Sequence, residues 1–287
     1  MKIGIQTDLL DTNGYGRWKD KTYMKLREHG YNCSDFSMAN TNTPIYTLPV
    51  DDAVKLLLAE KNLADKAGIE IVQTHGPWRW PAKDNTPEDR AERMDKMKRS
   101  LLFSSILGSK ITVLHPLMPY GICDKKEGNS QKTADINIEF FTDLLKTAKK
   151  YDVTICLENM PLEDFSLAKP SDILALVNTI DDEHLRVCLD TGHAFALNTL
   201  NPADEVRRLA SYLKALHIHD NMGNDDLHQM PCFGRIDWDD FASALKETNY
   251  RGNFTLETMP PRKLGNPIFE NLCVNLYKIA KEIADKI

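Results

Sequence analysis

Short apolar segments alternate with longer amphipathic segments along this chain, and that alternation constrains the fold more than any other feature. Rich in Ile, Val and Leu and bounded by polar residues, the apolar segments are typical of buried β-strands. They cover residues 2–8, 32–38, 69–76, 110–116, 153–160, 185–193, 213–220 and 252–258. The segments with helical periodicity cover 51–67, 88–107, 134–151, 171–179, 202–212, 238–248 and 267–285, with a weaker helix at 16–29.

This alternation predicts a parallel sheet, because neighbouring parallel strands need a crossover connection and a helix supplies it. Eight strand–helix units are also the number that closes a (β/α)8 barrel. The chain has 287 residues and contains no linker rich in Pro, Gly or Ser. The predicted fold is therefore α/β, a (β/α)8 TIM barrel in which residues 1–287 form a single domain. An open doubly wound sheet is the alternative, but no GxGxxG motif follows the first strand.

Acids and imidazoles stand where the predicted strands end. Burying such groups is costly unless they are paired or bind a metal, so their repeated position indicates one polar site. In a barrel, the carboxyl ends of the strands carry the active site. The residues at these ends are His75, His115, Glu158, Asp190, His193, His217, His219, Asp220 and Glu257.

The alternation of side chains along a strand predicts where these groups point. In VTICLENM, Glu158 shares a face with Cys156, whereas Ile155 and Leu157 lie on the other face. The predicted strands that end at Asp190, His217 and Glu257 follow the same rule. The aliphatic face should pack under the helices, so the face with the polar ends should point into the barrel mouth.

Glu158, Asp190, His217 and Glu257 combine hard carboxylate ligands with one imidazole, a set that suits Mn²⁺, Mg²⁺, Co²⁺ or Zn²⁺. Two further histidines, His193 in DTGH and His228 in DLH, follow an aspartate closely. Each pair could support the ligands, contact a substrate or bind further metal ions.

Other residues carry weaker signals. Trp78 and Trp80 follow His75, and they either wall a substrate pocket or pack locally within their loop. The two remaining histidines, His29 and His184, lie in polar segments and are expected at the surface.

Composition excludes some classes of function. The net charge of −6 argues against nucleic acid as the main partner, because phosphate binding normally leaves a basic patch. None of the six cysteines forms a CxxC pair, so all six are expected to be reduced.

No apolar stretch is long enough to span a bilayer, and MKIGIQTD lacks the features of a signal peptide. No membrane association and a cytoplasmic location are therefore expected. The absence of GxSxG gives no support to acyl transfer.

Several motifs together resemble a known superfamily. The segments THGPW, VLHP, LENM, DTGHAF, HIHDN, DDLHQMPCFGRIDW and LET are similar to those of the xylose isomerase-like TIM barrels. That superfamily includes sugar and sugar phosphate isomerases and epimerases, and a metal-dependent apurinic endonuclease called endonuclease IV. The resemblance covers most of the chain from the third predicted strand to the eighth.

The resemblance implies a divalent metal held by Glu158, Asp190, His217 and Glu257. In the sugar branch, the two glutamates also act as acid and base, and we expect His193, His219 and Trp78 to contact the substrate. In the endonuclease branch, nine ligands hold three zinc ions. The counterparts of those nine are His75, His115, Glu158, Asp190, His193, His217, Asp226, His228 and Glu257.

Two departures from the endonuclease pattern favour the sugar branch. The chain reads HPLMPYG after the fourth predicted strand rather than a glycine-rich HPGSH-type stretch, and the DNA-intercalating loop residues have no clear counterpart. We therefore predict a metal-dependent isomerase or epimerase that acts on a small sugar or sugar phosphate through an enediolate, with one to three metal ions. The alternatives are an endonuclease IV-like phosphodiesterase and a non-catalytic sugar-binding barrel. A homo-oligomer is compatible with the sequence.

Overall fold

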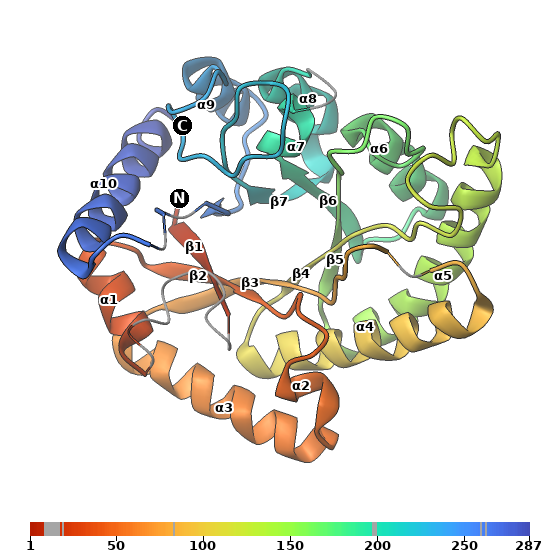
Figure 1. The fold of residues 1–287 in the computed structure, drawn as a ribbon, viewed down its shortest axis with the longest axis horizontal. Coiled ribbons are helices and arrows are strands. Elements are labelled where there is room, and N and C mark those ends of the chain that lie inside the picture. The colour runs from red at the N-terminus through yellow and green to blue at the C-terminus, as the bar shows by residue number, and fades with distance from the viewer. Residues whose placement is uncertain (9–17, 19, 83, 197–199, 259, 262) are drawn as a thin grey trace.

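Eight parallel strands form one sheet that curves into a barrel, with helices arranged around it (Figure 1). The computed structural model describes residues 1–8, 18, 20–82, 84–196, 200–258, 260–261 and 263–287. The strands are β1 (Ile3–Asp8), β2 (Cys33–Ser37), β3 (Glu70–His75), β4 (Ile111–Leu114), β5 (Thr154–Glu158), β6 (Leu185–Asp190), β7 (Leu213–His217) and β8 (Phe254–Leu256). Their order in the sheet, β7-β6-β5-β4-β3-β2-β1-β8, follows the chain apart from β8, which pairs with β1. The predicted barrel is thus confirmed.

The barrel closes where the residue after β7 pairs with the end of β8. The backbone N–H of Ile218 donates to the carbonyl oxygen of Thr255 (2.9 Å), and the N–H of Glu257 donates to the carbonyl oxygen of Ile218 (3.0 Å). These bonds accompany an isolated parallel bridge between Ile218 and Leu256. Closure therefore occurs beside His217 and Glu257, two of the residues that the sequence singles out.

The long helices lie where the periodicity predicts them, within a few residues. The helices are α1 (Thr22–His29), α2 (Pro44–Thr47), α3 (Val50–Ala67), α4 (Pro87–Leu107), α5 (Ser130–Tyr151), α6 (Pro170–Ile180), α7 (Thr191–Phe195), α8 (Pro202–Leu209), the 3-10 helix η2 (Ala210–Tyr212), α9 (Trp238–Glu247) and α10 (Asn266–Ala284). Proline occupies the first turn of α2, α4, α6, α8 and α10, where its missing N–H costs nothing. At α4, Thr86 and Asp89 add a reciprocal capping box.

Two apolar clusters confirm the predicted alternation of faces. Val113, Cys156, Cys188 and Ala215 form a small cluster of their own, on the strand faces that point into the barrel. Their neighbours along the strands, such as Ile155 and Leu216, belong to the large core between the sheet and the helices. Because the residues inside the barrel are mostly small, space remains at its mouth for polar side chains.

Some predictions need correction. The strand expected over 185–193 ends at Asp190, because the Asp190 side chain accepts a hydrogen bond from the backbone N–H of His193 and so caps α7. The short helices α2 and α7 were not predicted, since neither is long enough to show a helical period. The helix expected over 16–29 spans 22–29, while 16, 17 and 19 lie outside the described residues.

The two histidines expected at the surface are less exposed than predicted. His29 is only 6% exposed and its ring packs edge-on against Trp18, with 5.5 Å between ring centroids. His184 keeps 20% of its side chain exposed, beside Asp152 and Asp182. His29 is the last residue of α1, and its ring packs against an aromatic side chain instead of facing solvent. All six cysteines are free thiols, as expected, and no helix in the described part of the chain could cross a bilayer.

Candidate metal centre and active site

The four predicted metal ligands lie together at the carboxyl ends of four strands. Glu158, Asp190 and His217 are the last residues of β5, β6 and β7, and Glu257 directly follows β8. Each of these residues offers one ligand atom within 4.8 Å of the others. The first three are at most 1% exposed, and the side chain of Glu257 is 18% exposed. The convergence inferred from side-chain alternation is therefore present in the fold.

His217 is oriented by a residue that the sequence analysis missed. Its Nε2–H donates to Oδ2 of Asp35 (3.0 Å), so its Nδ1 faces the two glutamates. That Nδ1 lies 3.0 Å from Oε1 of Glu158 and 2.8 Å from Oε2 of Glu257. Asp35 is 1% exposed in β2 and also accepts a hydrogen bond from Nε2 of Gln73 (2.7 Å). A carboxylate in the middle of an apolar strand was the signal that could have identified it.

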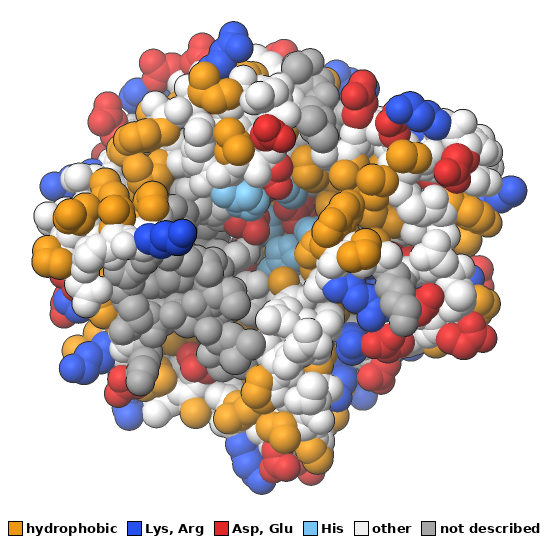
Figure 2. All heavy atoms as spheres, viewed as in Figure 1, with side chains coloured by type: hydrophobic (Ala, Val, Ile, Leu, Met, Phe, Trp, Pro, Cys, Tyr) orange, Lys and Arg blue, Asp and Glu red, His pale blue; other side chains and the backbone are white. Residues whose placement is uncertain are grey.

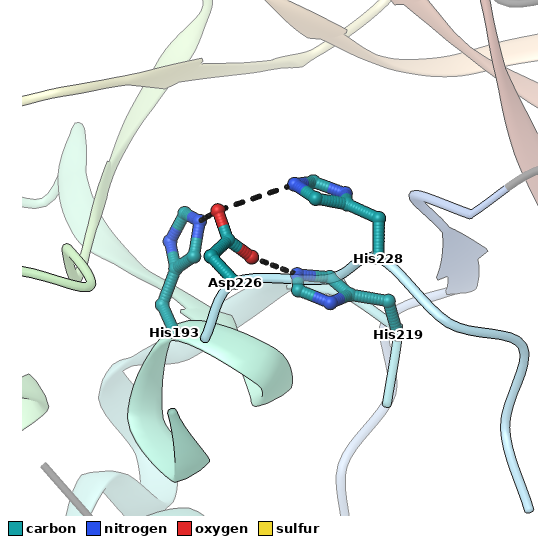
Figure 3. Close-up of side chains that lie close together, drawn as sticks. All are labelled: His193, His219, Asp226 and His228. Carbon is teal, nitrogen blue, oxygen red and sulfur yellow. Dashed lines mark ion pairs between the residues drawn. The ribbon is translucent and has the colours of Figure 1, made fainter. Parts of the chain in front are cut away.

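A second cluster lies beside the first, built from α7, the end of β7 and the loop that follows (Figure 3). Asp226 stands between imidazoles, with Oδ2 3.3 Å from Nε2 of His193 and 3.3 Å from Nε2 of His228. Its Oδ1 is 3.7 Å from Nε2 of His219, which also lies 3.0 Å from a carboxylate oxygen of Asp190. His219 thereby joins the two clusters.

A third group occupies the other side of Glu158. Nε2 of His115 is 3.0 Å from Oε2 of Glu158, and Nε2 of His75 is 3.1 Å from that His115 nitrogen and 3.5 Å from the same glutamate oxygen. The His75 ring stacks parallel to the ring of His217, with 5.6 Å between centroids. The structure therefore brings together all nine positions that the resemblance singled out.

Backbone carbonyls determine which nitrogen several of these histidines present. In His75, His193 and His228, the ring Nδ1–H donates to the carbonyl oxygen of Gly76 (2.8 Å), Asn159 (2.8 Å) and Glu257 (2.7 Å). Each ring then turns its Nε2 toward the neighbouring acids. Metal-binding histidines characteristically donate their other ring nitrogen in this way, because the bond fixes ring orientation and tautomer.

The titration behaviour of the clusters reflects burial and mutual contact. Burial alone would raise the pKa of Glu158, but His217 and His115 hold it well below its usual range. Burial likewise opposes ionisation of Glu257, and His217 more than compensates, so the pKa of Glu257 is lowered. Burial lowers the pKa of His115 to about 4, whereas the contact with Asp226 outweighs burial and raises the pKa of His228 to about 9. Glu158 and Glu257 are thus carboxylates at neutral pH.

Within the described part of the chain, the carboxylates of the site have no permanently cationic partner. Among the described residues, the ion pairs of Glu158, Asp190, Asp226 and Glu257 involve only histidines, with no Lys or Arg. Glu158 and Asp190 are at most 1% exposed and Glu257 is largely buried, and such buried negative charge is stable when a cation binds it. Oxygen and imidazole donors fit Zn²⁺, Mn²⁺ and Co²⁺ well, so the residues present fit a divalent metal.

A cavity of about 380 Å³ opens over the clusters, at the small end of the ~300–1,000 Å³ typical of small-molecule sites. Figure 2 shows imidazoles and carboxylates at the floor of this hollow. Glu158 and Glu257 reach the cavity, whereas Asp190, His217 and His219 lie behind its surface. An apolar wall faces the acids and is formed by Trp78, Trp80, Met160, Pro161 and Leu162.

Trp78 is held between an imidazole and a guanidinium. Its ring meets the His115 ring at a centroid distance of 4.4 Å, and the guanidinium of Arg93 lies 5.5 Å from the Trp78 ring centroid. Arg93 is itself fixed by Asp84, whose carboxylate accepts two hydrogen bonds from it (2.9 and 2.8 Å). Pocket lining and local packing, the two roles considered for Trp78, are therefore combined in one side chain.

Comparison with known proteins agrees with this geometry. The sequence model of the xylose isomerase-like TIM barrel matches residues 24–271. The chain belongs to the xylose isomerase-like TIM barrel family. A Methanocaldococcus jannaschii relative, uncharacterized protein MJ1311, is 30% identical over 244 residues, which cover 81% of this chain and 76% of the relative.

Relatives with named activities fall on both branches of the family. D-psicose 3-epimerase of Enterocloster bolteae is 25% identical over 83% of this chain and 76% of its own length. Apurinic-apyrimidinic endonuclease 1 of Plasmodium falciparum is 26% identical over 69% of this chain but only 34% of its own length.

Among solved structures, a D-tagatose 3-epimerase-like protein superposes with a TM-score of 0.76 at 24% identity, covering 100% of this chain and 99% of that one. The IolI protein, solved with a bound zinc atom, has a TM-score of 0.73 at 18% identity, with 100% and 99% coverage. These likenesses show the barrel fold.

Proposed function

We propose that this protein is a sugar epimerase or isomerase that depends on a divalent metal ion. One observation carries the proposal: of the four ligands at the strand ends, only Glu158 and Glu257 also line the cavity. A substrate in the cavity can therefore touch the two glutamates and the ion that they share. The family relationship to D-psicose 3-epimerase supports the same activity.

Glu158, Asp190, His217 and Glu257 would hold the ion. When bound, the ion would supply Lewis-acid stabilisation of the negative charge that develops on substrate oxygens. The low pKa values of Glu158 and Glu257 keep both side chains ready to accept a proton. One would remove the proton from the carbon beside a carbonyl, and in an isomerisation the same side chain would return it to the adjacent carbon. In an epimerisation the other glutamate, after taking up a proton from solvent, would deliver it to the opposite face.

The remaining residues of the cavity would bind the sugar. His193 lines the cavity beside Asp226, so we propose that it contacts a hydroxyl, while Trp78 and Trp80 pack against the C–H face of the sugar. His219 is fully buried and does not line the cavity. We therefore propose that His219 supports Asp190 and Asp226 rather than meeting the substrate directly.

Hydrogen exchange tests this function for any sugar that the site accepts. The metal-loaded protein is incubated in D₂O with ketoses, aldoses and their phosphates, and NMR follows loss of the proton next to the carbonyl. We expect exchange with at least one sugar, and a fall of about 10²–10⁴-fold in Glu158→Gln and Glu257→Gln. Glu163→Gln, which alters a glutamate in the loop after β5, is the matched control and should exchange at the wild-type rate. Absence of exchange with every sugar would contradict the proposal.

A second candidate is cleavage of phosphodiesters at abasic sites in DNA. It is favoured by one observation, the completeness of the His193, Asp226 and His228 cluster and of the His75, His115 and Glu158 group beside the first metal site. Several adjacent ions could activate water and stabilise a leaving oxygen. Metal analysis separates the candidates: three zinc ions per chain with nicking of an abasic duplex would support the nuclease, whereas a single ion without nicking would exclude it.

A further inference from the structure

The loop between β7 and α9 carries two residues of the second cluster, Asp226 and His228. Residues 221–237 form no helix and no extended strand, so little regular backbone hydrogen bonding holds their conformation. The segment is longer than most connections in compact domains, and buried backbone groups in such a loop need other partners. Contacts outside regular secondary structure must therefore hold Asp226 and His228 opposite His193.

The carboxylate of Asp220, at the start of this loop, supplies the partners. Asp220 is 0% exposed, although it is a charged residue. Its Oδ1 accepts hydrogen bonds from the backbone N–H groups of Asn221 (2.9 Å) and Ile236 (3.2 Å). Its Oδ2 accepts from the N–H of Cys232 (3.0 Å) and from the indole Nε1–H of Trp238 (2.9 Å). Four donors from both ends of the loop thus converge on one side chain.

All four partners donate, so both oxygens of Asp220 act as carboxylate acceptors, and they are shielded from water. Hydrogen bonds to a charged acceptor are roughly twice as strong as neutral ones. Among the described ion pairs, none involves Asp220, so the four donors are what satisfies its charge. The loop also approaches the carboxylate too closely for a side chain at Gly234, where a Cβ would lie 2.2 Å from Asp220 Oδ1.

Further contacts beside this carboxylate connect the loop to the element that presents His193. The backbones of Asp220 and Gln229 exchange two hydrogen bonds (2.8 and 2.9 Å), which fix the chain next to His228. The Asn221 side chain donates to the carbonyl oxygen of Gly192 in α7 (2.8 Å). The loop and α7 are therefore held relative to one another by residues that do not line the cavity.

We propose that Asp220 is a positioning residue: its buried carboxylate folds the loop 221–237 so that Asp226 and His228 face His193 (Figure 3). The inference rests on the second candidate function, and only in assigning that cluster a role in binding a metal ion. Asp220 itself touches neither the cavity nor the ligand atoms, so its effect passes through the loop.

The test compares Asp220→Asn with the wild type and with Asp225→Asn, which removes an exposed charge from the same loop. An amide at position 220 would turn an NH₂ group toward two of the donors. In the metal-free protein, hydrogen exchange read by mass spectrometry should be at least about tenfold faster for peptides covering 229–237 in Asp220→Asn. Peptides from β5 should be unchanged, and Asp225→Asn should match the wild type.

Zinc titration by calorimetry supplies the second readout. We expect Asp220→Asn to bind one fewer zinc ion per chain, or to bind that ion at least about tenfold more weakly, and to keep the ion held by the strand-end ligands. Wild-type exchange in the loop, or faster exchange with unchanged zinc binding, would overturn the proposal. If the wild-type second cluster binds no zinc, its proposed metal role fails while the exchange result still tests the anchor.

A milder variant guards against loss of folding. Trp238→Phe removes one of the four donors and keeps an aromatic ring in the helix α9. Its loop should exchange faster than in the wild type, by a smaller factor than in Asp220→Asn. An unchanged exchange rate in Trp238→Phe would also count against Asp220 as the anchor.

Discussion

Single hydrogen bonds decide what the residues of this site can bind. In His217, a bond from Nε2–H to Asp35 leaves Nδ1 to face Glu158 and Glu257, whereas in His75, His193 and His228 the roles of the nitrogens are reversed. The side-chain type offers both options, and the partner selects one. The ligand set is therefore defined by the atom that each residue presents. Asp35 determines which atom His217 presents, although Asp35 is not itself a proposed ligand.

Replacing Asp35 by Asn should weaken metal binding without removing any ligand. His217 and Gln73 both donate to Oδ2 of Asp35, and an amide oxygen in that place is a neutral acceptor, so it holds the His217 ring more weakly than the carboxylate does. Loss of such a supporting partner typically costs 10–100-fold in metal affinity, and calorimetric titration with zinc should show a decrease of that size. Asp51→Asn, in the first turn of α3, is the control. Equal affinities in the two variants would show that Asp35 does not orient His217.

Among the elements, α7 joins the two clusters most directly. The helix begins immediately after β6, and Asp190 both caps it and takes part in the first metal set. The ring of His219 packs against the backbone of α7 at Gly192, where a Cβ would lie 1.9 Å from His219 Cε1. The glycine of DTGH is therefore required by close packing rather than by an unusual backbone angle.

Replacing Gly192 by Ala should displace His219 and destabilise the fold. A methyl group forced into a packed site costs about 1–3 kcal/mol, measurable as a lower free energy of unfolding in urea. Gly265→Ala is the matched control, because a Cβ there meets nothing within 4 Å, and its cost should stay below about 1 kcal/mol. Similar stabilities of the two variants would mean that α7 shifts freely, contrary to its packing.

At the scale of the whole molecule, the proposed metal site spans the place where the two edges of the sheet meet to close the barrel. Its four ligands come from the ends of β5, β6, β7 and from the residue after β8. The edge between β7 and β8 is joined only by an isolated bridge, which makes it the least regular pairing among the described strands. An ion held across this edge would link strands that the sheet itself joins weakly.

Metal binding should therefore raise the stability of the protein. A ligand at one hundred times its Kd adds about 2.7 kcal/mol, which for a chain of this size corresponds to a rise in Tm of roughly 5–10 °C. Differential scanning calorimetry of the chelator-treated protein with added zinc or manganese should show that rise. Glu158→Gln should abolish most of it, whereas Glu163→Gln should not. A Tm independent of every divalent metal would refute a structural contribution from this site.

The features of the fold and site that could be predicted are those that depend on residues close together in the sequence. Strands and long helices were predictable because periodicity is local, and the alternation within VTICLENM placed Glu158 on the inner face without reference to any partner. The short helix α7 was missed because its capping bond, from His193 to Asp190, leaves no periodic trace. His29 was placed at the surface because neighbouring polar residues conceal its contact with Trp18.

The sequence by itself determined the number of strands, the inward face of each and the identity of the acids and imidazoles at their ends, since each of these depends on residues close together in the chain. Only the tertiary structure decided which atoms those residues present. Asp35 orients His217 across 182 positions, and Asp220 gathers donors from a loop with no pattern of its own. Burial makes such partners necessary, because a polar group removed from water must find its hydrogen bonds wherever the fold brings them.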